Sequence, residues 1–377
     1  MNPDIKIILV APIVEPVGVT VHIFNLAKLL KYNGWLDTVV CPNYGWLTSK
    51  LEKNNISFVV LDISIQPLKF IKSNNAFFEF LKSRNDSNIV HLHGRFPLFV
   101  SFKSIVFLKK YKFAITIHQF SSAGSRELFS WKKRLETLFL NFTNGICCVS
   151  NALKTEVRER VTINNNKKIV VIGNWIEPIE MKRKALTRSK TNRAKEKIKI
   201  CSIGRLSKEK GFDVLVKSLD LLRKNGINFE CDIFGEGPER LMLKDLIKGC
   251  GLDGIVRLKG ESYRIRKELT NYDVLIVPSR TESFGIVVLE AYDAGIPVIA
   301  SNVPGLNETI ISNKTGLLFK SESALELKKS IVKLMNSEKM KNKFSVNGRK
   351  YLRAKYVLNS HLIERFKKFY SGVLKDV

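Results

Sequence analysis

The sequence lacks any hydrophobic run long enough to cross a membrane. A spanning helix needs about 18 consecutive apolar residues, and no stretch of the 377-residue chain approaches that length. The apolar part of Met1–Pro12 is too short for a signal peptide, and no small-residue cleavage site follows it. We therefore expect a cytoplasmic protein in which this apolar run is the first strand.

Cysteine is also scarce. The six cysteines form no C-x-x-C pair, and no histidine stands at ligand spacing from any of them. Most fall in apolar runs, and they are Cys41, Cys147, Cys148, Cys201, Cys231 and Cys250. The pattern disfavours a zinc site at these residues and predicts reduced, buried thiols.

Acidic residues are outnumbered by basic ones. There are 35 Asp and Glu against 63 Lys and Arg, which gives a formal net charge of +28. The densest basic stretches are Met181–Lys197, Lys109–Lys112 and Trp131–Arg134. Such surfaces attract anionic lipid, at ~1 kcal/mol per basic residue, and they also attract nucleic acid. No helix-turn-helix, zinc finger or RNA-binding motif is present, so we expect an anionic membrane surface and no nucleic acid, with a soluble protein of basic surface as an equal alternative.

What the sequence contains in quantity is apolar residues, at 45% of the chain, which is enough for packed cores. The length favours two domains. Apolar runs of strand length alternate with amphipathic segments of helix length, which predicts α/β domains with parallel sheets. The strand Ile5–Ala11, the loop Pro12–Gly18 and the helix Val19–Tyr32 form the first such set. Sheets of this kind bind ligands at the carboxyl ends of their strands.

The most informative stretch is Pro278–Ser301. It follows an apolar run of buried-strand length, Asp273–Val277. We expect a helix to open at Phe284 or Gly285 and to end at Gly295, which can take the left-handed cap.

The start of that helix offers an anion site. Its first amides, at Phe284, Gly285 and Ile286, have no partner inside the helix and carry the positive end of its dipole. Glu290 lies a little over one turn further and can accept hydrogen bonds from a ribose diol. Glu282, ahead of the helix, can hold a second polyhydroxy group. The stretch predicts adjacent sites for a sugar, a diphosphate and a ribose; the alternative is an ordinary strand, loop and helix with two solvated glutamates.

A second motif supplies positive charge. The segment Gly204–Gly211, GRLSKEKG, follows an apolar strand. Arg205 and Lys210 can neutralise a diphosphate and stabilise the charge that grows on it as it leaves. Gly235 begins a G-x-G-P turn after the strand Cys231–Phe234, and this turn is weak evidence by itself.

Together these motifs resemble those of glycosyltransferase family 4. Two glutamates separated by seven residues in E-SFGIVVL-E, followed by AYDAGIPVIA, resemble the family's donor-binding motif. GRLSKEKG resembles its second signature. The resemblance implies the α/β GT-B architecture, with two facing Rossmann-like domains and a C-terminal helix that crosses back to the first. It also implies a nucleoside diphosphate sugar as donor substrate, retention of the anomeric configuration, and no cofactor or obligatory metal. We expect a UDP-sugar rather than a GDP-sugar.

The resemblance also implies roles for individual residues. Gly18 stands where the family has two adjacent glycines, the first of which is Val17 here. His118 closes the strand Ala114–His118 and matches a histidine beside the transferred sugar. The implied catalytic residues are His118, Arg205, Lys210 and Glu282. The implied donor-binding residues are Gly18, Gly204, Arg205, Lys210, Gly235, Glu282, Ser283, Phe284, Gly285, Ile286 and Glu290.

The other histidines of the first half are interpreted differently. His91 and His93 share one face of the strand Ile89–His93 by alternation. We interpret His91 as a core residue and His93, nearer the strand end, as a weaker active-site candidate than His118. His22 lies in a helix and is expected to pack rather than to react.

The expected organisation has four parts. Residues 1–180 form an acceptor-binding domain, 181–197 a basic linker, 198–355 a nucleotide-sugar-binding domain, and 356–377 the returning helix. We expect transfer of a hexose or N-acetylhexosamine to a hydroxyl of a glycan or lipid-linked acceptor, in surface polysaccharide or lipopolysaccharide synthesis, at the inner face of the plasma membrane. Three alternatives stay open: a GT-B nucleotide-sugar epimerase, a non-catalytic basic protein on the membrane surface, and a nucleic-acid-binding protein.

Overall fold

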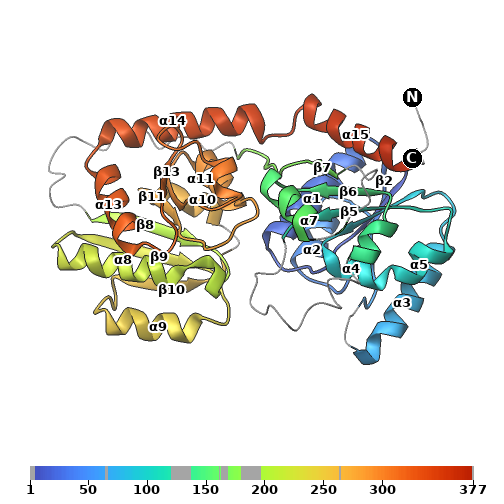
Figure 1. Ribbon diagram of the computed structural model, residues 1–377, viewed down its shortest axis with the longest axis horizontal. Helices are drawn as coiled ribbons and strands as arrows, with labels where there is room; N and C mark the ends of the chain where they lie inside the picture. Colours follow the sequence, from blue (N-terminus) through green and yellow to red (C-terminus); the bar gives the residue numbers. More distant parts are fainter. Residues whose placement is uncertain are drawn as a thin grey trace. The chain divides into compact units, whose positions relative to one another are not determined.

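The structure, a computed structural model, describes residues 5–63, 67–119, 137–160, 162, 169–179, 197–262 and 265–375. The chain divides into two compact units, and each is built on its own parallel sheet (Figure 1). The first unit comprises Met1–Trp175 and Leu358–Val377, and the second comprises Ile176–Val357.

The sheet of the first unit has seven strands in the order β3-β2-β1-β4-β5-β6-β7. Its central strands are apolar runs buried on both faces, as parallel sheets covered by helices require. The strands are β1 (Ile7–Val10), β2 (Leu36–Cys41), β3 (Phe58–Val60), β4 (Ile89–His93), β5 (Lys112–Ile117), β6 (Gly145–Cys148) and β7 (Ile169–Val171). The direction in which strands are added reverses between β1 and β4, so a ligand site is expected at their carboxyl ends.

Helices from both ends of the chain cover this sheet. They are α1 (Gly18–Tyr32), α2 (Trp46–Lys53), α3 (Pro67–Lys82), α4 (Arg95–Val100), α5 (Phe102–Phe107), α7 (Asn151–Arg160) and α15 (Ser360–Leu374). The last helix, α15, packs on β4, β5 and β6. It does so through buried aromatic side chains, among them Phe366 and Tyr370. The C-terminal helix is therefore part of the core of the first unit.

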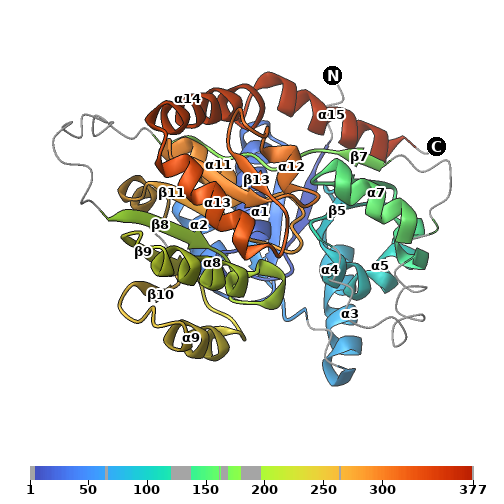
Figure 2. The same cartoon turned by 60° about the vertical axis from the view of Figure 1, so that its left-hand side comes forward.

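The sheet of the second unit has six strands in the order β10-β9-β8-β11-β12-β13, and its switch point lies between β8 and β11. The strands are β8 (Ile198–Ile203), β9 (Phe229–Phe234), β10 (Val256–Gly260), β11 (Val274–Val277), β12 (Val298–Ser301) and β13 (Leu317–Phe319). Its helical elements are η2 (Lys208–Lys210), α8 (Phe212–Lys224), α9 (Arg240–Gly249), α10 (Ile265–Glu268), η3 (Leu269–Asn271), α11 (Ile286–Ala294), α12 (Leu306–Thr309), α13 (Ala324–Met335) and α14 (Glu338–Lys355). Figure 2 shows α8 and α13 beside each other on this unit, and the two helices are in contact.

The boundary between the units differs from the expected one. The backbone amide of Ile176 donates to the carbonyl of Tyr356 at 3.0 Å, and the amide of Ile179 donates to the Asp293 carboxylate at 3.0 Å. These bonds attach residues 176–179 to the second unit, although the sequence had assigned them to the first. The expected linker, residues 181–197, lies outside the described residues except for Lys197.

Some element boundaries also differ. The basic stretch Lys109–Lys112 lies between α5 and β5 and includes the first residue of β5. The glycine expected in the first loop, Gly18, is instead the first residue of α1. Residues 137–142 are helical, and the basic stretch 131–134 lies outside the described residues.

The predictions drawn from the lack of long apolar runs and the small number of cysteines can be compared with the structure. Among the described residues, none of the helices combines the length and apolar character needed to cross a membrane. The six cysteines are free, and five of them are buried. Burial raises the pKa of the Cys41 and Cys147 thiols to about 12, as expected for unreactive core cysteines.

Candidate active site

The two motifs of the second unit meet at the switch point of its sheet. The segment Gly204–Gly211 follows β8, and the segment Pro278–Gly285 follows β11. Because β8 and β11 are neighbouring parallel strands, both segments leave the sheet at the same edge. The arrangement places them where α/β sheets bind ligands.

An arginine that the sequence analysis did not single out ties the two segments together. The amide of Arg280 donates to the carbonyl of Glu209 at 2.8 Å. Its guanidinium donates to the carbonyl of Lys208 at 2.8 Å and to both carboxylate oxygens of Asp213, at 2.8 and 2.9 Å. These bonds lower the pKa of Asp213, which therefore stays ionised. The clamp holds the lysine-bearing loop against the loop that carries Glu282.

Close packing explains why position 235 is a glycine. Gly235 has φ 134°, and a Cβ atom on it would collide with the carbonyl oxygen of Gly204. The turn after β9 therefore presses on the loop after β8, and only glycine permits that approach. This contact brings together two residues that the sequence analysis assigned to donor binding.

Lys210, expected at the diphosphate, and Glu282, expected at the sugar, contact each other directly. Lys210 Nζ donates to Glu282 Oε2 at 2.6 Å. The two side chains are only 25% and 16% exposed, so this is not a solvated surface pair. A bound diphosphate and the Glu282 carboxylate would compete for the same ammonium group. The other expected cation, Arg205, is exposed, and its guanidinium makes no hydrogen bond or ion pair with a described residue.

The helix after Glu282 begins as the sequence predicts. Gly285 is the N-cap of α11, in the left-handed region at φ 83°, and Gly295 caps the C-terminus at φ 73°. Among the described residues, no acceptor bonds the amides of Phe284, Gly285 and Ile286, so they are available to an anion. A Cβ atom on Gly285 would lie 2.7 Å from Leu306 Cδ2. Backbone conformation and packing therefore explain this glycine, whether or not a ligand approaches it.

Glu290 differs from an ordinary surface glutamate. It is half-buried on α11, and no described residue donates a hydrogen bond to it. Loss of solvation raises its pKa to about 7; Arg266 opposes this effect and Asp293 adds to it. Arg266 is held by Asp293 at 2.7 Å. A carboxylate with unused acceptor capacity in a sheltered position is suited to a ligand that brings hydroxyl donors.

The two remaining candidates lie in the first unit. Gly18 starts α1 after the loop that follows β1. His118 directly follows β5 and is half-buried. His91 is a core residue, as expected, with hydrogen bonds from its two ring nitrogens to the hydroxyls of Tyr370 and Thr116, each 2.8 Å long.

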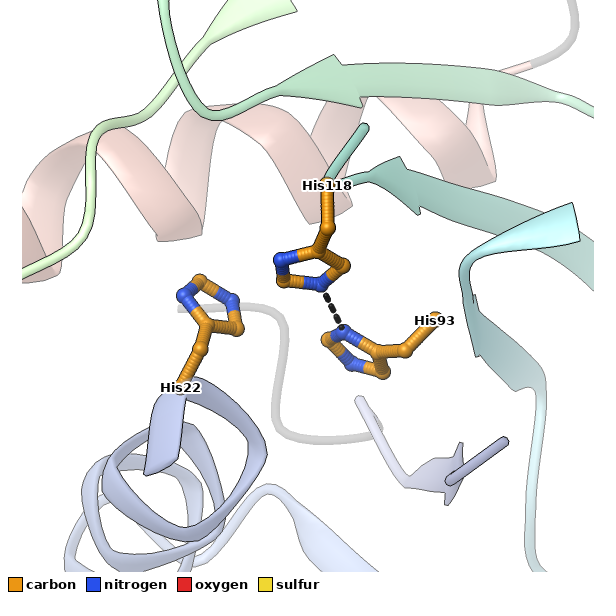
Figure 3. A group of neighbouring side chains, drawn as sticks. All are labelled: His22, His93 and His118. Carbon is orange, nitrogen blue, oxygen red and sulfur yellow. Dashed lines mark hydrogen bonds between the residues drawn. The ribbon is translucent and has the colours of Figure 1, made fainter. Parts of the chain in front are cut away.

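His22 and His93 form an unexpected cluster with His118 (Figure 3). His93 Nδ1 lies 3.1 Å from His118 Nε2. The ring centroid of His22 is 4.8 Å from that of His118 and 5.4 Å from that of His93. Sequence reasoning treated these rings separately because they are far apart in the chain. The available signal was that His93 ends β4 and His118 directly follows β5, while His22 lies on α1, the helix that follows β1.

Comparisons with known proteins match both halves of the chain. The protein-family model described as Glycosyltransferase Family 4 matches residues 16–179, and the family model described as Glycosyl transferases group 1 matches residues 183–351. An uncharacterized 41.2 kDa protein in the cps region of Klebsiella pneumoniae is 31% identical over 274 residues, which are 67% of this chain and 70% of that protein.

Two further relatives carry names or ligands. The capsular polysaccharide biosynthesis glycosyltransferase CapM of Staphylococcus aureus is 26% identical over 251 residues, 62% of this chain and 65% of CapM. The crystal structure of Anabaena Alr3699/HepE in complex with UDP and glucose has a TM-score of 0.79 at 19% identity, covering 97% of this chain and 99% of that one. The fold is therefore GT-B, and the chain belongs to glycosyltransferase family 4, with the group 1 glycosyl transferase domain in its second half; it is a glycosyltransferase.

Proposed function

We propose that this enzyme transfers a hexose or N-acetylhexosamine from a UDP-sugar to a hydroxyl of a glycan or lipid-linked acceptor, with retention of the anomeric configuration, in surface polysaccharide synthesis. The observation that carries the proposal is the Lys210–Glu282 pair at the switch point. Lys210 lies after β8, and Glu282 lies on the loop that leads into α11, whose first amides have no side-chain cap. UDP and glucose in HepE, and the naming of CapM, support the donor class and the pathway.

The donor is assigned to the second unit. Its diphosphate lies on the amides of Phe284 to Ile286, with Arg205 and Lys210 as counter-charges. Its ribose diol donates to Glu290, and its sugar lies against Glu282. In the reaction, the bond between the anomeric carbon and the diphosphate oxygen breaks. The acceptor oxygen bonds to the same face of that carbon, and the acceptor proton passes to the departing diphosphate. The protein's part is to stabilise the negative charge that develops on the leaving group.

Acceptor binding is assigned to the first unit, where Gly18 and His118 stand near the carboxyl ends of β1 and β5. We further propose that this unit docks on an anionic membrane. The adjacent helices α3 and α5 expose the large apolar side chains Ile71 and Phe107, at 71% and 68%. Lys72 and Lys109 beside them are also exposed. Sedimentation with anionic vesicles, compared with neutral vesicles and at raised salt, tests this attachment.

The donor proposal is tested by calorimetric titration and by turnover. UDP-sugars should bind the wild-type protein, and Lys210→Met should weaken the binding. Lys224→Met is the matched control, because Lys224 forms an ion pair of 2.7 Å with Asp220 on the exposed side of α8. With a glycan or lipid-linked acceptor, UDP should be released in step with product, and NMR should show the donor's anomeric configuration in the product.

The alternative functions predict other results. Release of UDP without transfer would favour an epimerase. No turnover together with membrane binding unaffected by Lys210→Met would favour a scaffold protein. Strongly salt-dependent binding of generic DNA would favour a nucleic-acid-binding protein. Any of these, in place of UDP-sugar binding and transfer, would overturn the proposal.

A further inference from the structure

We propose that His22, His93 and His118 form a binding site for a divalent transition-metal ion, such as Zn²⁺, within the first unit. The three histidines come from α1, from the end of β4 and from the residue after β5. Figure 3 shows their rings converging from these three elements. The three histidines belong to the first unit, whereas the donor residues implied by the resemblance belong to the second unit except Gly18.

The spacing of the rings is close to that of a metal site. One nitrogen from each ring lies within 4.8 Å of the other two. In a tetrahedral zinc site the metal–nitrogen distance of 2.0–2.1 Å places ligand nitrogens about 3.3 Å apart. His93 Nδ1 and His118 Nε2 are already 3.1 Å apart. Only the His22 ring has to move inward, by up to roughly 1.5 Å, which a side-chain rotation can supply.

Two nitrogens of the cluster lack partners. Nε2 of His22 and Nε2 of His93 are buried, and neither has a hydrogen-bond partner among the described residues. Buried polar atoms are nearly always satisfied, so the unpartnered Nε2 of His22 points to a missing ligand. His93 would bind through Nδ1, and its Nε2 is the outer nitrogen of that ring.

A neighbouring side chain fixes the form of His22 that can bind a metal. Asn174 Oδ1 lies 2.7 Å from His22 Nδ1. Because a carbonyl oxygen only accepts, Nδ1 carries the proton and Nε2 presents its lone pair. In Figure 3 the side of the His22 ring that holds Nε2 faces the other two rings. Metal-binding histidines are typically held in this way, by an acceptor on the nitrogen away from the metal.

The charge state of the rings also suits a metal. Burial favours the neutral form of an imidazole, and the neutral form is the one that binds metal. When the metal binds, the proton shared by His93 Nδ1 and His118 Nε2 moves to the outer nitrogen of its own ring, so no further proton acceptor is required.

The donor set selects the class of ion. Three neutral imidazoles suit Zn²⁺, Co²⁺, Ni²⁺ or Cu²⁺ and are poor ligands for Mg²⁺ or Ca²⁺, which prefer oxygen. The edge of Trp175 packs on His22, with ring centroids 5.2 Å apart, and gives the site an apolar wall. His118 is half-buried, so the cluster is reached from its side. Three protein ligands leave one tetrahedral position for water or another oxygen ligand.

The test is metal binding to the full-length protein, from which any histidine tag has been removed. Co²⁺ should give the visible spectrum of a tetrahedral or five-coordinate nitrogen site, and Zn²⁺ should displace it at one ion per chain. Mg²⁺ should not. His22→Gln and His93→Gln should each abolish the cobalt spectrum. His361→Gln is the matched control, since His361 lies exposed on α15 and is not part of the cluster.

A second pair of variants separates coordination from folding. Asn174→Ala should weaken Zn²⁺ binding by about 10- to 100-fold, and Asn174→Asp, which keeps the acceptor, should restore it. Circular dichroism and melting temperature in the presence of a chelator show whether each variant is folded. No cobalt spectrum in wild-type protein would overturn the proposal. So would a spectrum that survives in folded His22→Gln and His93→Gln, or one that is lost in His361→Gln.

These measurements need neither donor nor acceptor. Failure of the metal proposal therefore leaves the proposed glycosyl transfer untouched. Conversely, metal binding by a protein that shows no transfer would overturn only the proposed function.

Discussion

Replacing Glu290 by glutamine should make the second unit more stable above neutral pH while weakening donor binding. The physical reason is the pKa of Glu290, which loss of solvation raises from 4.5 to about 7. Between these values the folded protein keeps a proton that the unfolded chain has lost. The contribution of this group to the free energy of unfolding is therefore complete below pH 4.5 and is lost as the pH rises through about 7. Glutamine has the same shape and no charge to bury.

The magnitude can be worked out from the structure. Raising a pKa from 4.5 to about 7 corresponds to about 3 kcal/mol. Glu290 is half-buried, so solvent screening reduces this to ~2 kcal/mol. For a unit the size of residues 176–357, that gain raises the melting temperature by about 4–8 °C at about pH 8. Near pH 4.5 the variant and the wild-type protein should have the same melting temperature.

The same substitution should weaken donor binding. A ribose diol that donates to the ionised carboxylate adds a charge-assisted bond of about 1.5–3 kcal/mol, so Glu290→Gln should weaken UDP-glucose binding by about 10- to 100-fold at about pH 8. In the wild-type protein, affinity should fall about tenfold per pH unit below about 7. UDP-glucose is preferable to UDP as ligand, since its diphosphate has no terminal phosphate that titrates near pH 6.

Calorimetric titration and thermal melting across pH measure both effects. Glu364→Gln is the control, because Glu364 lies exposed on α15 in the other unit and should change neither quantity. An equal stabilisation at both ends of the pH range would refute the raised pKa. Unchanged affinity for UDP-glucose would refute the assignment of Glu290 to the ribose.

Three further predictions follow from contacts in the structure. Lys210→Met should lower kcat/KM for the donor by about 10²–10³-fold, because it removes a counter-charge and leaves a carboxylate unpaired; steady-state kinetics measure this, and Lys224→Met should change the value less than about twofold. Gly235→Ala should lower the melting temperature of the second unit by several degrees, because the new Cβ atom would collide with the carbonyl oxygen of Gly204. Gly226→Ala is the control for the cost of positive φ alone, since Gly226 has φ 69° and open space around it. Tyr370→Phe should cost about 1–3 kcal/mol in urea unfolding of the first unit, because its buried hydroxyl bonds a buried histidine; no loss would show that the bond contributes nothing.

Much of the fold could be predicted because parallel strands buried on both faces are short continuous apolar runs. The runs before Pro278 and Gly204 became β11 and β8, within a residue of the expected boundaries. Boundaries were less predictable where pairing rather than apolarity decides them. Strand β9 begins at Phe229, two residues before the expected Cys231, because Phe229 pairs with Ile198 of the neighbouring strand.

The two segments of the second unit could be singled out because their residues stand close together in the chain and next to glycines. What the sequence could not supply was the set of contacts across loops. The Arg280 clamp joins segments about 70 residues apart, and the Lys210–Glu282 bond joins two residues that had been given separate tasks. The histidine cluster was hidden for the same reason, since only the parallel register of β1, β4 and β5 brings the ends of these strands together.

The position of α15 has a consequence for synthesis on the ribosome. Residues 176–357 form one continuous segment and can complete their packing once that segment has emerged. The N-terminal residues emerge earlier, yet part of their interior is supplied by Phe366 and Tyr370 near the end of the chain. Until translation ends, the nascent first half exposes the apolar surface that these rings will cover. We therefore expect the half that is made second to finish folding first, and a chain that stops before α15 to be vulnerable to aggregation and proteolysis in its first half.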